Sequence, residues 1–245
     1  MADREFLILF VARTGSSHLA ELLTSAGVGD VREWLNPAFR EGQAQFFRTT
    51  NLADYFAAIR RARQNGVFGQ KMTIWFYEAF SRETRLEDHF NFAVPTVFLF
   101  RENIVEQAVS LCMAAGRNVF HNTGALPADL PDVAYNAADI RQCVESFVNE
   151  ELRLRAFVQQ HGSLVRYLSY EQLASADPRR VVEAIAALVG VKSDVAKLKS
   201  AHRKLGDDAN RAHAQRFVEE HRDYVGAVGR RRQWLLDALR EKPLL

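Results

Sequence analysis

Short apolar runs alternate with amphipathic stretches along most of the chain. Runs of strand length, bounded by charges or turn residues, lie at residues 6–11, 67–72 and 96–100. A fourth apolar run, at residues 163–168, begins directly after His161-Gly162, which is a plausible helix stop. Because these runs are short and almost uninterrupted, they predict parallel strands that are covered on both faces.

Between the runs, apolar residues recur at helical spacing. The spacing predicts helices at residues 16–26, 52–64, 104–115, 137–160 and 178–189, each followed within two residues by a glycine. Asp177 and Pro178 have the pattern of an N-cap followed by a first-turn proline. Strands that alternate with helices predict an α/β fold built on a parallel sheet with right-handed crossovers.

Two segments fall outside this alternation. Residues 117–139 contain prolines and a glycine and show little periodicity, so we expect a loop that serves as a lid or contacts an acceptor. Residues 207–245 predict a charged, helical C-terminal extension, and its basic cluster at residues 230–232 is interpreted as a solvated helix face. Since the chain has no internal repeat or low-complexity segment, we expect residues 1–245 to form a single domain.

Charge and cysteine content restrict the function further. The 245 residues carry a net charge of +2, which excludes the strong basic field of a non-specific nucleic-acid binder but leaves a local anion site open. The only cysteines, Cys112 and Cys143, exclude a disulfide framework and a four-cysteine zinc site, and suit a reducing compartment. We expect no metal, because His, Asp and Glu show no clustered ligand pattern.

The start of the chain carries no sign of export or membrane insertion. Its apolar run is too short to span a membrane, stops at Arg13 and lacks an export-type cleavage region. We therefore expect a cytoplasmic protein without a membrane span.

The junction after the first predicted strand has the features of an anion site. Gly15 allows backbone N–H groups to converge, the helix that follows adds its positive end, and Ser16 and Ser17 add hydroxyl donors. Arg13 supplies a full charge beside the turn. The alternative is an ordinary capped helix with Arg13 in solvent. The GxxxxGK[ST] pattern of a nucleotide-triphosphatase P-loop is absent.

A second candidate anion contact follows the third predicted strand. Arg101 comes directly after that strand, and Ser110 lies on the helix that follows. Because ligands of parallel α/β sheets bind outside the carboxyl ends of the strands, we expect Arg101 near Arg13. An arginine and a hydroxyl in this arrangement can hold a second phosphate.

Taken together, these segments resemble the sulfotransferases that use 3′-phosphoadenosine-5′-phosphosulfate (PAPS). The Arg13–Ser17 loop is similar to their 5′-phosphosulfate loop, and the Arg101–Ser110 segment is similar to their 3′-phosphate element. Within that superfamily the chain is most similar to the bacterial trehalose 2-sulfotransferase-like branch. Further segments that resemble this branch, in its order, are Gly27-Val28, Glu33-Trp-Leu35, Phe68-Gly-Gln-Lys71, residues 167–173 and Asp177-Pro178.

The resemblance implies a P-loop-like sheet, a sulfuryl transfer from PAPS that leaves 3′-phosphoadenosine-5′-phosphate (PAP), and no metal. It implies that Arg13, Thr14, Gly15, Ser16 and Ser17 hold the 5′-phosphosulfate and that Arg101 and Ser110 hold the 3′-phosphate. Lys71 would lie near the bridging oxygen or the sulfuryl group, and Glu33 would be the general base. Lys204 lies in a region similar to the loop that covers the donor.

Several points stay open at this stage. Lys71 could be a rim lysine and Glu33 a solvated carboxylate, while His18 could be a second base or a packed helix residue. The acceptor is a small-molecule hydroxyl, with a carbohydrate or glycolipid suggested by the resemblance alone. A homodimer is open, because relatives in this branch can dimerise. The alternative functions are a P-loop-type small-molecule kinase and a non-catalytic nucleotide-binding module.

Overall fold

Five parallel strands form the central sheet of the protein, in the order β2-β3-β1-β4-β5. The computed structural model describes residues 4–120, 131–162, 164–201 and 208–245. The strands are β1 (Arg4–Phe10), β2 (Asp30–Arg32), β3 (Val67–Met72), β4 (Thr96–Phe100) and β5 (Val165–Ser169). The predicted parallel α/β sheet is therefore confirmed, and β3 and β4 have the predicted bounds.

β1 lies at the centre of the sheet, where Leu9 pairs with Met72 of β3 on one side and with Phe98 of β4 on the other. β2 was not predicted, because it has only three residues and two of them are charged. All the pairings are parallel, so every strand delivers its carboxyl end to the same edge of the sheet.

Helices follow the strands and build the rest of the fold. They are α1 (Ser16–Ser25), α2 (Arg40–Phe47), α3 (Leu52–Arg61), α4 (Ile74–Ser81), α5 (Ile104–Arg117), α6 (Ala137–His161), α7 (Tyr170–Ser175), α8 (Pro178–Val189), α9 (Asp208–Glu220) and α10 (Arg222–Glu241). Short 3₁₀ turns occur at Pro37–Phe39, Leu86–Asp88 and Val195–Lys197. The predicted helices are confirmed with ends shifted by up to three residues, and α9 and α10 confirm the helical C-terminal extension.

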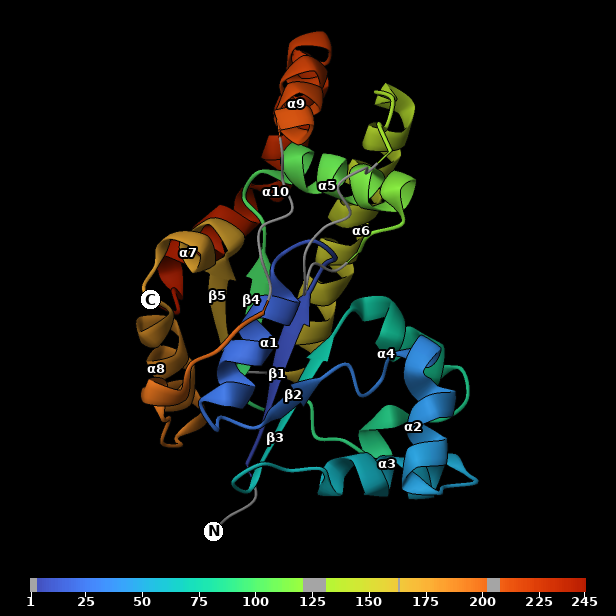
Figure 1. Cartoon of the computed structure of the whole chain (residues 1–245), viewed down its shortest axis with the longest axis vertical. Coiled ribbons are helices and arrows are strands. Elements are labelled where there is room, and N and C mark those ends of the chain that lie inside the picture. The colour runs from blue at the N-terminus through green and yellow to red at the C-terminus, as the bar shows by residue number, and fades with distance from the viewer. Residues whose placement is uncertain (1–3, 121–130, 163, 202–207) are drawn as a thin grey trace.

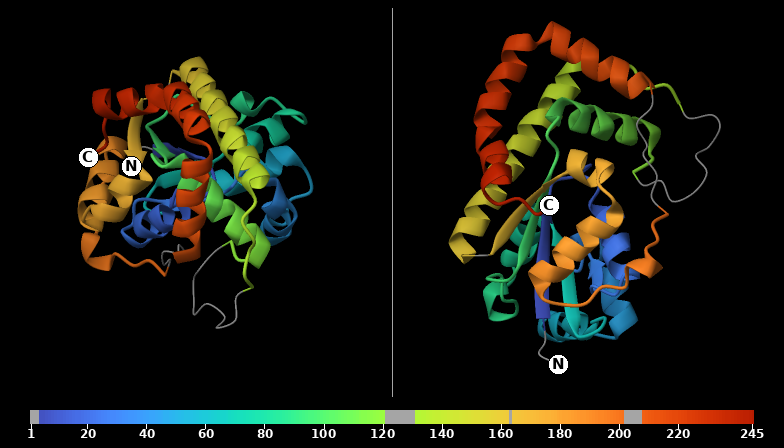
Figure 2. Two further views of the ribbon diagram at one scale, coloured as in Figure 1. Left: turned by 90° about the horizontal axis from the view of Figure 1, so that it is seen from above. Right: turned by 90° about the vertical axis from the view of Figure 1, so that its left-hand side faces the viewer.

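The helices enclose the sheet between two layers. α1 and α8 cover one face and α6 the other, while α10 packs beside β5 at the edge (Figures 1 and 2). α5 and α9 lie beyond the carboxyl ends of the strands, where they pack against each other. No helix in the described part of the chain is both long enough and apolar enough to cross a membrane.

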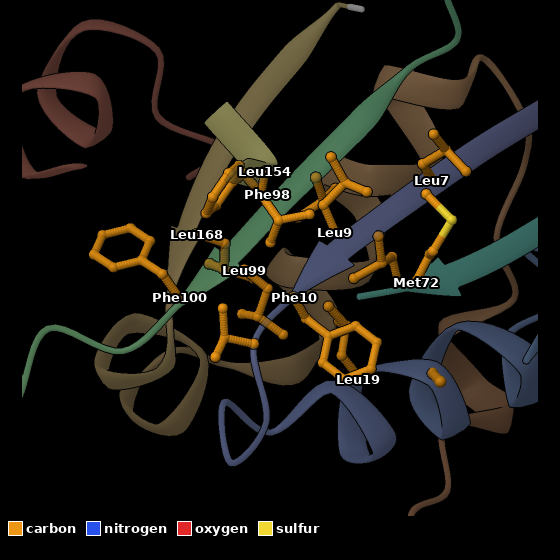
Figure 3. Packing of buried hydrophobic residues seen from close by; sticks show 14 of the residues in the cluster. Leu7, Leu9, Phe10, Leu19, Met72, Phe98, Leu99, Phe100, Leu154 and Leu168 are labelled. Carbon is orange, nitrogen blue, oxygen red and sulfur yellow. The ribbon is translucent and has the colours of Figure 1, made fainter. Parts of the chain in front are cut away.

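The core runs along the middle of the sheet, and the central strands are almost fully buried. Figure 3 shows part of it, with residues of β1, β4 and β5 between Leu19 of α1 and Leu154 of α6. Apolar packing of both sheet faces fixes the strand ends in place. The turns that leave those ends therefore start from rigid positions.

Candidate active site

The turn between β1 and α1 is built for close backbone approach. Gly15 has a φ of 79°, and a Cβ added there would lie 3.2 Å from Tyr170 Cδ2, so only glycine fits without strain. Thr14 is fully buried, and its hydroxyl donates to the Val11 carbonyl at 2.9 Å. No side chain caps α1, which leaves its first N–H groups available to an anion at the sheet edge.

Arg13 leaves this turn toward α5. Its backbone is also left-handed, with a φ of 68°. Its Nε donates to Ser110 Oγ at 3.0 Å, and one terminal nitrogen donates to the Phe120 carbonyl at 2.6 Å. Burial lowers the pKa of Arg13, and the nearby charge of Arg101 lowers it further. Arg13 therefore lies close to both Ser110 and Arg101, as expected from the sequence.

Arg101, at the end of β4, is only 8% exposed. Its guanidinium lies 4.5 Å above the ring of Tyr170 and donates to Glu106 Oε2 at 2.6 Å. Its Nε is 3.8 Å from Glu171 Oε1 and makes no hydrogen bond within the described part of the chain. A buried arginine with hydrogen-bonding capacity to spare is suited to an anionic ligand.

Gln107 on α5 connects these two turns; it lies within the segment that resembles the 3′-phosphate element, but this contact was not predicted. It is fully buried, and its amide donates to the Ala12 carbonyl at 2.7 Å. Its Oε1 has no partner among the described residues. An unpaired buried amide oxygen normally has a ligand or water as its partner.

A second group of predicted residues meets at the ends of β3 and β2. Lys71 is nearly buried, and its Nζ donates to Ser17 Oγ at 2.9 Å. The same Nζ lies 3.0 Å from Glu33 Oε1. Ser17 thus connects the turn between β1 and α1 to the Lys71–Glu33 pair, and neither Lys71 nor Glu33 is a solvated rim residue.

Asn36 holds the other oxygen of this carboxylate. Its Nδ2 donates to Glu33 Oε2 at 2.6 Å, and its Oδ1 accepts from the Ala38 N–H at 3.0 Å. Asn36 therefore caps a 3₁₀ turn and orients Glu33 at the same time. The Asn36-Pro37 pair is a cap signal in the sequence, but it does not reveal the contact with Glu33.

Of the other predicted residues, Ser16 belongs to the same turn and is buried at the start of α1. His18 Nδ1 lies 2.8 Å from Ser200 Oγ, and Ser200 donates to Glu21 Oε2 at 2.9 Å, so His18 contacts the C-terminal half of the chain. Lys204 and residues 121–130 of the predicted lid lie outside the described residues.

The basic cluster at residues 230–232 corrects the sequence interpretation. Arg230 and Arg231 are exposed, but Arg232 is only 7% exposed and forms a buried ion pair with Glu151 of α6 at 2.7 Å. It also donates to the carbonyls of Arg101 and Glu102, at 2.6 and 3.0 Å. The error arose because the cluster lies on one helix, where the sequence does not show which arginine faces the protein.

Comparison with known proteins assigns the chain to a family. The family model of the Stf0 sulphotransferases matches residues 5–220, so the chain belongs to the Stf0 sulphotransferase family. It is therefore a sulfotransferase, and the predicted membership of the PAPS-dependent superfamily is confirmed. Comparison with curated proteins gives no significant match.

A solved structure of retinol dehydratase, in a complex with retinol and PAP, is similar to this chain with a TM-score of 0.47 and 13% sequence identity. The match covers 99% of this chain and 83% of the other. In the described part of the chain, no group of three His, Cys, Asp or Glu side chains is placed to hold a metal ion.

Proposed function

We propose that this sulfotransferase binds PAPS at the carboxyl edge of the sheet and transfers its sulfuryl group to a hydroxyl of a small molecule, with Glu33 as the general base. One observation carries the proposal. Ser17 accepts a hydrogen bond from Lys71, which brings the Lys71–Glu33 pair against the same turn from which Arg13 reaches Ser110. The turn that carries Arg13 suits a phosphate-rich donor, and the Lys71–Glu33 pair suits a proton transfer.

The donor side would use the fixed charges of the turn. Arg13, Gly15, Ser16 and Ser17, with the start of α1, would hold the 5′-phosphosulfate, and the buried Thr14 would keep their turn in shape. Arg101 and Ser110 would hold the 3′-phosphate. The spare hydrogen-bonding capacity of Arg101 Nε supports a ligand here. We also propose, from its sequence position alone, that Lys204 contacts the donor.

The transfer side would handle the proton and the developing charge. The acceptor oxygen forms a bond to sulfur while the bond from sulfur to the 5′-phosphate oxygen breaks, and PAP leaves with the bonding electrons. The acceptor proton passes to Glu33. Lys71, which has Glu33 as its partner, is close enough to the turn to neutralise charge on the bridging oxygen.

The acceptor class is the finer part of the proposal. We propose a carbohydrate or glycolipid, which the family resemblance suggests. Large exposed aromatic side chains on the segments that follow Glu33 and Lys71 support it, since aromatic faces bind sugars: Phe39, Phe46 and Trp75 are 51%, 80% and 49% exposed. We further propose that the chain is a single domain, that residues 117–139 act as a lid, and that the enzyme works in the cytoplasm of a bacterium.

The test separates chemistry from binding. The Glu33→Gln variant is compared with wild type for PAP release from PAPS in a panel of mono- and disaccharides, and for PAP affinity by calorimetry. Loss of a positioned base predicts a rate about 10²–10⁴-fold lower, with PAP affinity unchanged. Glu41→Gln, an exposed carboxylate on α2, is the matched control and should retain full rate.

Two results would contradict the proposal. Full turnover by Glu33→Gln would exclude Glu33 as the base. Wild-type protein that binds PAP but sulfates none of the saccharides offered would point to a non-catalytic nucleotide-binding module instead.

A further inference from the structure

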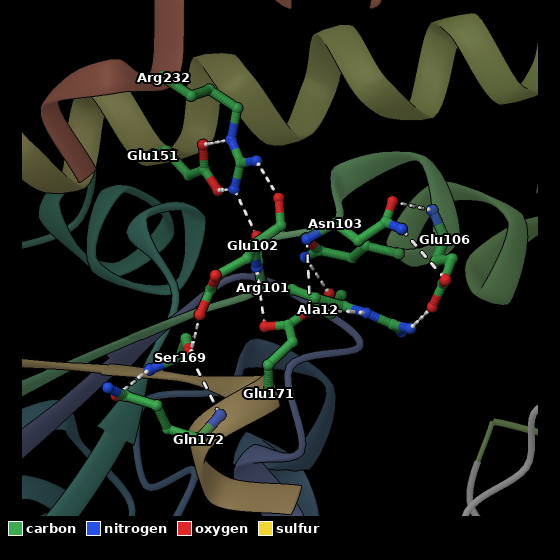
Figure 4. Close-up of polar contacts among 11 residues, drawn as sticks. Ala12, Arg101, Glu102, Asn103, Glu106, Glu151, Ser169, Glu171, Gln172 and Arg232 are labelled. Atoms are coloured by element: carbon green, nitrogen blue, oxygen red, sulfur yellow. Dashed lines mark hydrogen bonds and ion pairs between the residues drawn. The ribbon is translucent and has the colours of Figure 1, made fainter. Parts of the chain in front are cut away.

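We propose that Arg232 of α10 is a positioning residue for the donor site, acting through Arg101 to set the preference for a 3′-phosphate. The inference rests on the proposed function, because it takes Arg101 as the contact to that phosphate. Figure 4 shows the arrangement, with Arg232 and Glu151 directly beside the turn that carries Arg101.

The turn at residues 101–103 is held by charged side chains. Arg232 donates to the carbonyls of Arg101 and Glu102, at 2.6 and 3.0 Å. The N–H groups of Glu102 and Asn103 donate to the Glu171 carboxylate, at 2.9 and 3.2 Å. The carbonyls of the turn are therefore held by a cation, Arg232, and its N–H groups by an anion, Glu171.

Glu102 adds a third restraint, since its carboxylate accepts from Ser169 Oγ at 2.6 Å. Ser169 is the end of β5 and the N-cap of α7. The turn is thus tied to the sheet through β5 and to the C-terminal helix through Arg232. The side chain of Arg101 starts from this fixed backbone, so its guanidinium has a defined origin.

Arginine is the residue type that this role requires. Its guanidinium spans Glu151 with two donors, from Nε and one terminal nitrogen, both at 2.7 Å, while the same group reaches two carbonyls. A lysine ammonium has three donors on one nitrogen and cannot match this planar pattern. Arg232 therefore does more than neutralise Glu151.

Stability alone does not account for the buried pair. Glu151 is 1% exposed and burial raises its pKa, which shows how unfavourable the site is for a lone carboxylate. Replacing a buried ion pair by apolar residues of similar volume is often neutral or stabilising. The burial of this ion pair is instead explained by positioning, because the remaining donors of Arg232 bind the turn that carries Arg101.

Arg232 lies C-terminal to the segment that the family model matches. The family model matches residues 5–220, and α10 begins at Arg222. The positioning residue thus lies in the part of the chain beyond the family match. The last helix would be a working component of the donor site.

The experiment measures the ratio of PAP to adenosine 5′-phosphate (AMP) affinity by calorimetry on the full chain. The main variant, Glu151→Leu with Arg232→Met, removes both charges and leaves none buried alone. Arg231→Met is the matched control, because Arg231 is the neighbouring arginine and its ion pair with Glu145 is 41% and 38% exposed. AMP lacks the 3′-phosphate, so its affinity reports the integrity of the rest of the site.

We expect the PAP-to-AMP preference of the double variant to fall about tenfold, which corresponds to the loss of one anchoring hydrogen bond. The AMP affinity of the double variant should remain that of wild type, and Arg231→Met should keep both the wild-type preference and the wild-type AMP affinity. A PAP-to-AMP preference within about twofold of wild type would overturn the inference. This holds even if the melting temperature falls, because a purely structural role lowers the melting temperature without changing the preference. If the double variant does not fold, Arg232→Lys is judged by the same criterion. Failure of the wild type to prefer PAP would instead contradict the proposed function itself.

Discussion

The two halves of the candidate site differ in how their charges are balanced. Beside β1 and β4, Arg13 has a serine and a carbonyl as partners, has no acidic partner in the described part of the chain, and lies close enough to Arg101 for its pKa to be lowered. Beside β2 and β3, Lys71 and Glu33 neutralise each other. Arg101 has Glu106 and Glu171 as acidic neighbours, so Arg13 is the cation of the first half without a carboxylate partner in the described part of the chain, whereas the cation of the second half is neutralised.

This difference matches the two substrates of a sulfuryl transfer. The phosphate groups of a donor can neutralise Arg13, and a neutral hydroxyl meets the Lys71–Glu33 pair, whose charges already balance. Ser17 lies between the halves, bonded to Lys71. We therefore expect substitutions on the arginine side to weaken binding and substitutions on the lysine side to slow transfer.

After Glu33→Gln, the largest effect is expected from Lys71→Met. Removing one preorganised donor from a transfer site costs about 10²–10³-fold in kcat, measured as PAP release from PAPS with a saccharide panel. PAP affinity should fall much less than the rate, since Arg13 and the start of α1 would still hold the 5′-phosphate of PAP. Lys197→Met, at an exposed lysine of a 3₁₀ turn, is the control. Weakened PAP binding with an unchanged rate would remove the distinction between the halves.

Arg101→Ala should act in the opposite way. Loss of a charged hydrogen-bonding partner lowers PAP affinity about 10- to 100-fold, while AMP affinity stays near that of wild type because AMP lacks the 3′-phosphate. Calorimetric titration of both nucleotides measures this. Arg85→Ala, an exposed arginine with a side chain 75% exposed, is the control. Equal losses of affinity for PAP and AMP would show that Arg101 does not contact the 3′-phosphate.

Gly15→Ala should disturb both halves at once, since the turn connects them. A left-handed φ of 79° strains any residue with a Cβ, which would also lie 3.2 Å from Tyr170. We expect a loss of about 1–2 kcal/mol in the free energy of unfolding, with weaker PAP binding. Gly162→Ala has a similar φ, 62°, but open space around its Cβ, and should lose stability alone. PAP affinity that falls equally in both variants would show that the turn has no special role.

The smallest effect is expected from Asn36→Asp. The new carboxylate can still cap Ala38 but cannot donate to Glu33, and its charge disfavours ionised Glu33. We expect the rate to fall about five- to tenfold and the acid limb of the pH–rate profile to move to higher pH. Asn51→Asp, which caps α3 away from the site, is the control. A lower rate with an unmoved profile would mean that Asn36 does not act through Glu33.

Much of this arrangement could be predicted because it follows from topology. Apolar runs define β1, β3 and β4, and the meeting of parallel strand ends at one edge brings Arg13 and Arg101 together. Glu33 and Lys71 were identified by resemblance, and their contact through β2 and β3 was not predicted. β2 is too short to leave a pattern.

The contacts that were not predicted are tertiary ones. Arg232 is separated from Arg101 by 131 positions, and Gln107 from Ala12 by 95. The spacing of polar residues within one helix does not show which of them will face a distant turn. Asn36 was missed for a related reason, since its cap is local but its bond to Glu33 requires the loop to fold back.

Calorimetric titration of the wild-type protein with PAP, and with AMP and ATP as comparisons, tests the central claim most directly. A site in which Arg13 awaits an anionic partner and Arg101 holds a 3′-phosphate predicts tight PAP binding and much weaker binding of AMP and ATP. Equal affinity for ATP, or no binding of PAP, would contradict the account.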